Sequence, residues 1–133
     1  MIDQLINKEL TRKYGRNFKA GDVIFQEGQE GDYMYIILSG AIKIFKTIKG
    51  KVEELSKLEK GEFFGETAIT GKKPRSASAI ATKDCLLLAI NHEAFSEMLT
   101  KNQEVVMIIL KKLAERIRQA NLKIEKMIKE EKK

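Results

Sequence analysis

The chain has 133 residues, a net charge of +6 and a hydrophobic content of 43%. This length suits one ordinary domain, and the composition excludes a disordered chain because it supplies enough apolar residues for a core. The longest apolar runs, at 85–90 and 105–110, have six residues each, whereas a membrane span needs about 20. The N-terminus shows no signal peptide. We therefore expect one cytoplasmic domain over residues 1–133, with no membrane contact.

Cysteine and histidine each occur once, as Cys85 and His92. A single cysteine excludes an internal disulfide, a four-thiolate iron–sulfur cluster and a cysteine-based zinc site. A single histidine excludes a His-rich metal site and leaves few partners for a nucleophilic triad. We therefore expect no metal, no cofactor and no catalytic residues, so the chain is not predicted to be an enzyme.

Most of the positive charge lies near the C-terminus, where residues 101–133 hold ten Lys/Arg and five Asp/Glu. A basic chain raises the possibility of nucleic-acid binding. Here, however, acidic residues are interleaved with the basic ones along one predicted helix, which is typical of a solvated helix face. We therefore expect no direct DNA binding.

The first two segments of the chain differ in their hydrophobic spacing. In residues 1–16, apolar positions three and four apart predict a short amphipathic helix over 2–13. From 17 to 90, short β-rich runs alternate with glycine turns. Strands of this length and spacing indicate an antiparallel β jelly roll, so the fold class is mainly β with flanking helices. The strands are predicted at 23–25, 33–38, 41–45, 76–81 and 85–90.

The third segment, residues 91–133, is predicted to be helical. Asn91 can cap a short helix, and Thr100 with Gln103 forms a capping box that would open a long one. The first turns of the long helix are expected to pack on the sheets. Beyond them, an apolar stripe at heptad positions a and d favours a parallel homodimer over a helix that contacts only its own domain. The stripe consists of Leu110, Leu113, Ile117, Ala120, Ile124 and Met127.

Residues 61–77 combine groups that suit an anion with a neighbouring hydroxyl. Gly65 precedes about one helical turn, and the N–H groups at a helix N-terminus attract anions. Arg75 offers paired donors to two phosphate oxygens. Glu66 can accept a hydrogen bond from a hydroxyl group, and it can also hold Arg75 in position. A phosphate beside a hydroxyl indicates a nucleotide, with a simple surface Glu–Arg pair as the alternative.

The same stretch resembles the phosphate-binding cassette of cyclic nucleotide-binding domains. The matching motifs are Phe-Gly-Glu-Thr-Ala-Ile at 64–69 and Pro-Arg-Ser-Ala at 74–77. Upstream, residues 21–28 and 33–40 are similar to the glycine-punctuated strands of that family. The resemblance extends over roughly residues 17–130 and implies a β jelly roll flanked by helices, in agreement with the hydrophobic spacing.

The resemblance also implies a role for each cassette residue. Glu66 would bind the ribose 2′-hydroxyl, and Arg75 would bind the cyclic phosphate. Gly65 and Ala77 would donate backbone N–H groups, and Ser76 would donate a hydroxyl. The candidate ligand-binding residues in the cassette at 64–77 are Phe64, Gly65, Glu66, Thr67, Ala68, Arg75, Ser76 and Ala77.

Two positions depart from the family pattern. Thr67 replaces a hydrophobic residue, and Ala120 with Asn121 stands where relatives place a base-contacting Thr-Ser pair. Asn121 can still donate to a base edge or accept from one, so it joins the candidate ligand-binding residues. The expected ligand is cAMP, with cGMP as the alternative.

The expected function is therefore a cyclic-nucleotide receptor domain that signals through its C-terminal helix and a homodimer. The alternative is the same fold acting as a dimerisation or scaffold module. A metal-dependent jelly-roll enzyme would need several histidines. The sequence ends at Lys133, where relatives that regulate transcription continue into a helix-turn-helix. A stand-alone sensor is therefore expected, and its downstream protein partner is left open.

Overall fold

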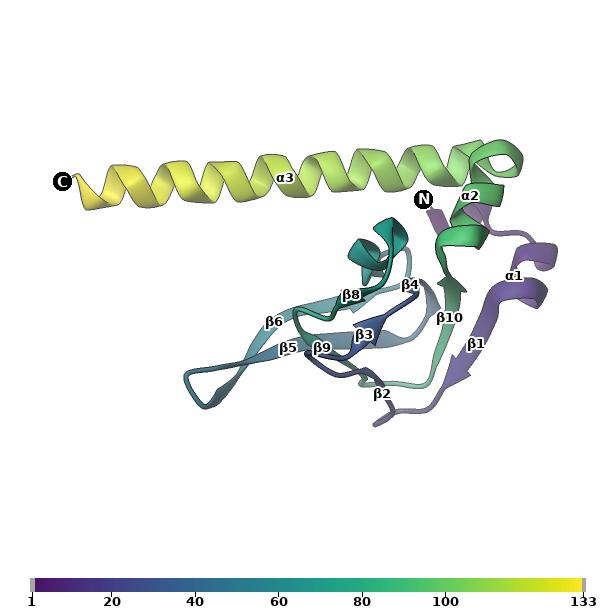
Figure 1. Ribbon diagram of the computed structural model, residues 1–133, viewed down its shortest axis with the longest axis horizontal. Coiled ribbons are helices and arrows are strands. Elements are labelled where there is room, and N and C mark those ends of the chain that lie inside the picture. Colours follow the sequence, from purple (N-terminus) through teal and green to yellow (C-terminus); the bar gives the residue numbers. More distant parts are fainter. Residues whose placement is uncertain (1, 133) are drawn as a thin grey trace.

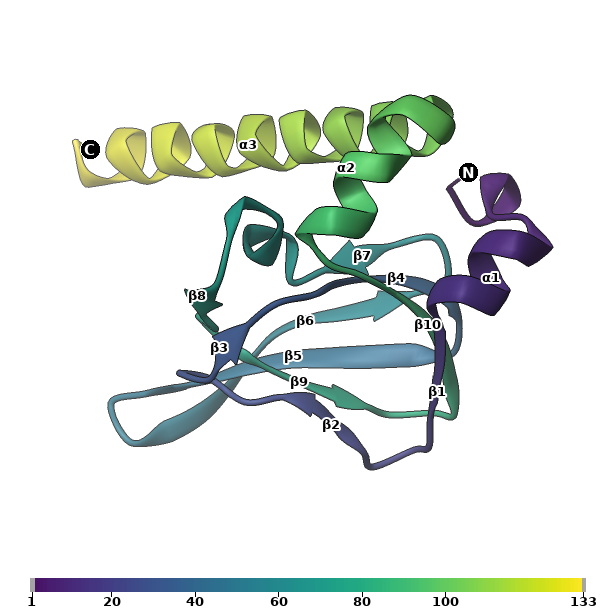
Figure 2. The ribbon, with the colours of Figure 1, turned by 45° about the vertical axis from the view of Figure 1, so that its right-hand side comes forward.

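The computed structural model describes residues 2–132, so residues 1 and 133 of the predicted domain lie outside the described part. Two antiparallel sheets pack face to face, and helices from both ends of the chain lie on one side of them (Figure 1; Figure 2). This arrangement confirms the predicted mainly β jelly roll with flanking helices.

The strands are β1 (Gly15–Phe18), β2 (Val23–Phe25), β3 (Glu30–Gly31), β4 (Met34–Ser39), β5 (Ala41–Ile48), β6 (Lys51–Glu59), β7 (Phe63–Phe64), β8 (Lys73–Pro74), β9 (Ser78–Ala81) and β10 (Cys85–Ile90). One sheet has the order β1-β10-β4-β7 and the other β2-β9-β5-β6, while β3 pairs with β8. The β3–β8 pair links the segment before β4 to the cassette, because Gly31 lies opposite Lys73.

Two short helices precede the sheets, where one was predicted. They are the 3₁₀ helix η1 (Ile2–Leu5) and the α-helix α1 (Lys8–Tyr14). Asn7 separates them, because its side chain accepts a hydrogen bond from the Leu10 backbone N–H at 2.8 Å and so begins a new helix. The single helix predicted over 2–13 is therefore wrong in its continuity.

Two helices follow the sheets, namely α2 (His92–Lys101) and α3 (Gln103–Glu131). The predicted cap at Asn91 is confirmed, since its side chain accepts from the Ala94 N–H at 2.9 Å. The predicted capping box is wrong. Thr100 lies inside α2, where its hydroxyl donates to the Glu97 carbonyl, and α3 begins only after Asn102.

The core has two layers because β4 and β10 are buried on both faces. Along β4, Met34 and Ile36 point to the helices, whereas Tyr35 and Ile37 point to the opposite sheet. This double burial explains why both strands are continuous apolar runs in the sequence. The helix-side layer includes Leu88, Ile90, Met98 and Ile109, and the layer between the sheets includes Ile42, Ala79, Leu87 and Ala89.

The first turns of the long helix α3 are buried against this core. Val105, Val106 and Ile109 are buried, whereas Ile117 and Ile124 farther along are more than half exposed. Figure 1 shows α3 continuing along the helical side of the sheets to the C-terminus. The expected packing of its first turns is confirmed. Among residues 2–132, no helix has the length and apolarity that a membrane crossing requires.

Candidate functional site

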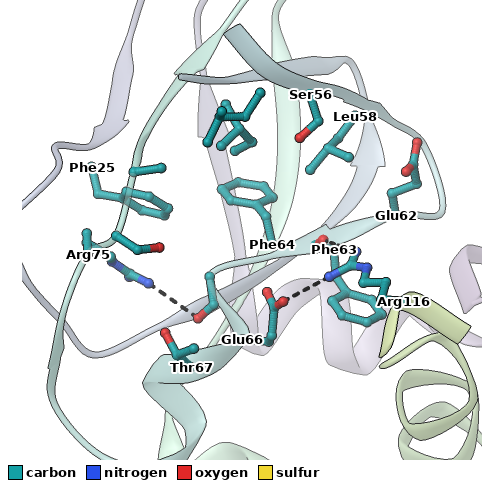
Figure 3. Close-up of a pocket in the computed structure, with 15 residues that line it drawn as sticks. Phe25, Ser56, Leu58, Glu62, Phe63, Phe64, Glu66, Thr67, Arg75 and Arg116 are labelled. Atoms are coloured by element: carbon teal, nitrogen blue, oxygen red, sulfur yellow. Dashed lines mark hydrogen bonds and ion pairs between the residues drawn. The ribbon is translucent and has the colours of Figure 1, made fainter. Parts of the chain in front are cut away.

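A cavity of about 450 Å³ lies beside the cassette, bounded by β5, β6, β7 and α3 (Figure 3). One part of its wall is apolar, and another part carries two guanidinium groups and two carboxylates. The lining residues are Phe25, Ile44, Leu55, Ser56, Leu58, Glu62, Phe63, Phe64, Gly65, Glu66, Thr67, Arg75, Ser76, Ala77 and Arg116.

Gly65 connects β7 to the short 3₁₀ helix η2 (Glu66–Thr70). This agrees with the prediction that a glycine here precedes about one helical turn. Its φ of 74° is in the left-handed region, which a glycine adopts without strain. A Cβ at this position would lie 2.8 Å from Nη1 of Arg75. The glycine therefore sets the turn and also lets the backbone approach the guanidinium. No side chain of the described residues caps η2, so its first N–H groups keep the anion preference of a helix N-terminus.

Among the described residues, backbone carbonyls hold the Arg75 side chain and no carboxylate is bonded to it. Only 7% of the residue is exposed. Nη2 donates to the Tyr33 carbonyl at 2.7 Å, Nη1 donates to the Gly65 carbonyl at 3.3 Å, and Cζ lies 3.9 Å from the centre of the Phe25 ring. Within residues 2–132, Nε is buried and has no hydrogen-bond partner.

Burial lowers the pKa of Arg75, because a low-dielectric surrounding disfavours its charge. A guanidinium nevertheless stays protonated in proteins. The cavity wall therefore carries a fixed, incompletely satisfied cation. Such a group favours an anionic ligand that restores the interactions lost with water.

Glu66 pairs with α3 and not with Arg75. Its Oε1 accepts from Nη1 of Arg116 at 2.9 Å, and Nη2 of Arg116 donates to the Phe63 carbonyl at 2.7 Å (Figure 3). The Arg116 guanidinium also stacks on the Phe63 ring, with Cζ 4.2 Å from its centre. The expectation that Glu66 holds Arg75 is thus corrected, because backbone carbonyls hold Arg75. The contact of Glu66 with a ribose hydroxyl stays a prediction.

The fold brings most of the predicted site residues together, but it separates two of them from the cavity. Ala68 is buried in η2 and does not line the cavity. Asn121 is exposed on α3, outside the lining of its own chain. The candidate ligand-binding residues that line this one cavity are Phe64, Gly65, Glu66, Thr67, Arg75, Ser76 and Ala77.

Sequence reasoning missed Arg116 and the β6 residues of the lining. In the sequence, Arg116 is one of several charges beside the apolar stripe of the long helix. One signal was available, because Arg116 lies four residues before Ala120, which belongs to the pair expected to contact a base. Residues four apart share one helix face.

Comparisons with known proteins agree with the fold. A model of the cyclic nucleotide-binding domain matches residues 15–102. A cyclic AMP receptor protein of Thermus thermophilus is 33% identical over 111 residues, which are 83% of this chain and 51% of that protein. A cGMP-dependent protein kinase of Toxoplasma gondii is 39% identical over 90 residues, which are 68% of this chain and 9% of the kinase.

The crystal structure of the Thermus thermophilus catabolite activator protein has the same fold. The TM-score is 0.77 at 29% identity, and the match covers 93% of this chain and 61% of that one. This chain spans about half the length of the receptor protein and a smaller share of the kinase. The matched family region takes up more than half of the chain and contains the whole cassette. The chain belongs to the cyclic nucleotide-binding domain family.

Proposed function

We propose that this domain is a receptor for a cyclic nucleotide, whose phosphate binds at Arg75. The observation that carries the proposal is the state of this side chain. It is a buried cation that is bonded, among the described residues, to backbone carbonyls and to no carboxylate, and it lies in the wall of a cavity beside the N-terminus of η2. A cyclic phosphate offers acceptors to such a donor set.

The neighbouring residues suit the rest of a nucleotide. In the proposal, Gly65 and Ala77 donate backbone N–H groups to the phosphate, and Ser76 donates its hydroxyl. Glu66 accepts the ribose 2′-hydroxyl. Since Glu66 is bonded to Arg116 through Oε1, its second oxygen can accept this hydroxyl while α3 keeps the carboxylate oriented.

The apolar part of the cavity suits a purine. Ile44, Leu55 and Leu58 line it and offer a surface on which a base can be removed from water. We propose cAMP as the first ligand, because the relative named for cyclic AMP matches more of this chain than the relative named for cGMP. cGMP is the alternative. Asn121 would read the base only from a neighbouring copy or after α3 moves.

Two observations support signalling through α3. Arg116 connects this helix to Glu66 in the cavity, and Lys112 connects it to the Gly61 carbonyl that precedes β7. A ligand that forms a hydrogen bond with Glu66 would therefore change the contacts of α3. The exposed stripe of that helix supports a parallel homodimer, in which the change would be passed to a second copy.

Isothermal titration of the wild type with cAMP and cGMP tests the proposal, using an Arg75→Ala variant and an Arg118→Ala control. Arg118 is an exposed arginine of α3 that pairs with Glu115. We expect Arg75→Ala to weaken binding by about 2–5 kcal/mol, the scale of truncating a buried charge contact. Its fold should be retained, because Arg75 lies in a cavity wall. Arg118→Ala should bind like the wild type.

Equal affinity of the wild type and Arg75→Ala would contradict the assignment of the site. If the wild type binds neither nucleotide, the scaffold alternative replaces the receptor. If cGMP binds tighter than cAMP, the receptor stands and its ligand changes.

A further inference from the structure

The Arg75 guanidinium lies in a narrow slot whose walls come from separate parts of the chain. The Phe25 ring covers it, with its centre 3.9 Å from Cζ, while the Tyr33 and Gly65 carbonyls accept from the terminal nitrogens. The remaining wall is Gly31, a buried residue of β3. The slot decides where the positive charge lies in the cavity.

Gly31 has no room for a side chain. A Cβ at this position would lie 2.3 Å from Nε and 2.4 Å from Cζ of Arg75, far inside van der Waals contact. The clash is with the guanidinium itself, which the Tyr33 and Gly65 carbonyls and the Phe25 ring hold in place, so it can move only by giving up these contacts. The Gly31 φ is also outside the left-handed region, so its backbone does not itself demand glycine. The requirement for glycine is therefore one of space.

The backbone around the slot is fixed on both sides, so Gly31 cannot simply move away from Arg75. Gly31 pairs with Lys73 across the β3–β8 ladder. The Arg75 N–H donates to the Gln29 carbonyl at 2.7 Å, and the Gly28 N–H donates to the Arg75 carbonyl at 2.8 Å. With both backbones tied together, an added methyl group at Gly31 has to displace the guanidinium.

We propose that Gly31 is a positioning residue for ligand binding: its missing side chain is the space that admits the Arg75 guanidinium to its phosphate-binding position. The proposal rests on the receptor function above and adds a residue that contacts no ligand. It acts through Arg75 alone, so its effect must disappear when Arg75 is removed.

A Gly31→Ala variant, titrated with cAMP and cGMP, tests the proposal against the wild type and a Gly50→Ala control. Gly50 lies between β5 and β6, where a Cβ meets nothing within 4 Å. We expect Gly31→Ala to lose affinity by at least about tenfold, the scale of one lost charge-assisted hydrogen bond. Gly50→Ala should bind like the wild type, even though its positive φ makes alanine costly there.

Thermal unfolding without ligand gives a second readout that does not depend on nucleotide binding. Gly31→Ala should lower the Tm in the wild-type background, because the methyl group overpacks the guanidinium. In an Arg75→Ala background, the same substitution should lower the Tm by less than half as much. This comparison also applies if Gly31→Ala alone is too unstable to titrate.

The outcomes separate this inference from the proposed function. A wild type that binds no nucleotide, or binds as well without Arg75, contradicts the function, and the Tm comparison still decides whether Gly31 makes room for Arg75. A wild type that binds through Arg75, together with a Gly31→Ala variant of equal affinity, overturns the inference alone. An equal loss of Tm in both backgrounds also overturns it, because the methyl group would then meet something other than Arg75.

Discussion

Glu66 and Arg75 line one cavity but have different partners. Glu66 is bonded to Arg116 from α3, and Arg75 is bonded to backbone carbonyls and stacked on Phe25. The two side chains are therefore positioned by different hydrogen-bond partners. A substitution of Glu66 should leave the Arg75 guanidinium in its slot, so the contribution of each charge to binding can be measured separately.

A Glu66→Gln variant should bind cAMP more weakly than the wild type does, because the hydroxyl contact changes from charge-assisted to neutral. The substitution should not weaken the binding of 2′-deoxy-cAMP, which has no hydroxyl at that position. Removing a negative charge near the phosphate even favours the deoxy ligand slightly. Titration of both nucleotides against both proteins gives the comparison.

A Glu62→Gln variant is the matched control for charge, because Glu62 is the other carboxylate of the cavity lining. It should not discriminate between the two nucleotides. If Glu66→Gln weakens the binding of cAMP and of 2′-deoxy-cAMP to the same extent, Glu66 does not bind the ribose hydroxyl. Its role would then be limited to holding Arg116.

At the scale of elements, Glu97 of α2 connects this helix to α1. Its carboxylate pairs with Lys101 at 2.9 Å and with Lys13 of α1 at 3.3 Å, and it accepts from the Tyr14 hydroxyl. Hydrogen bonds and attraction from Lys101 and Lys13 lower the pKa of Glu97 to about 2. The residue therefore prefers the charged form more strongly in the folded protein than in the unfolded chain.

The direction of the pH dependence follows from this depressed pKa. The stabilising contribution is complete above the ordinary pKa of 4.5 and is lost as the pH falls from there towards about 2. A Glu97→Gln variant should be less stable than the wild type near neutral pH, and the difference should shrink across this acid range. The effect is modest because the pair is solvent-exposed. Thermal unfolding at a series of pH values measures it.

Glu115 provides the comparison, because its pKa is also lowered to about 2, but by Arg118 and Gln119 of its own helix. Glu115→Gln should change the stability over the same acid pH range, but it should leave the contact between α1 and α2 unchanged. Hydrogen exchange of the α1 amides should therefore increase in Glu97→Gln and not in Glu115→Gln. An unchanged pH profile in Glu97→Gln would show that the bridge contributes no stability.

The strands differ in how well the sequence predicts them, and burial explains the difference. β4 and β10 are buried on both faces and therefore form apolar runs that are easily recognised. β6 is exposed along nearly its whole length and carries charged residues at many positions, so its hydrophobic pattern is weak. It was not predicted, although it supplies Leu55, Ser56 and Leu58 to the cavity.

The site shows the same division between local and distant contacts. The cassette was predictable because its residues are close in sequence and fold as one turn of helix, a loop and a strand. Arg116 lies 50 residues from Glu66 in sequence, and only the packing of α3 on the sheets brings the two together. Gly31 likewise gains its role from the pairing of β3 with β8, which a glycine in a turn does not reveal.

At the scale of the whole molecule, α3 is the element that would connect ligand binding to assembly. Leu110, Ile117, Ile124 and Met127 are each more than half exposed on one stripe of this helix. A helix with an unpartnered apolar stripe is stabilised when a second copy covers it. Because Arg116 of the same helix is bonded to Glu66, a change in the position of α3 would be felt in the cavity.

An Ile117→Asp and Ile124→Asp double variant should be monomeric, because a parallel dimer would then bury like charges across its seam. It should still fold, since Ile117 and Ile124 lie outside both core layers. A Gln119→Asp and Leu122→Asp double variant introduces the same charge on exposed positions away from the stripe and should stay dimeric. Light scattering after size exclusion reports the oligomeric state of each.

If dimerisation and ligand binding are coupled, the monomeric variant must also bind cAMP more weakly. The coupling is reciprocal, so the factor by which the dimer strengthens binding equals the factor by which cAMP strengthens the dimer. Titration of the monomer gives the first factor, and the dimer dissociation constant of the wild type with and without cAMP gives the second. If the Ile117→Asp and Ile124→Asp variant stays dimeric, the apolar stripe of α3 is not the dimer interface. A monomer with full affinity refutes the coupling and shows that the cavity of one chain is sufficient for binding.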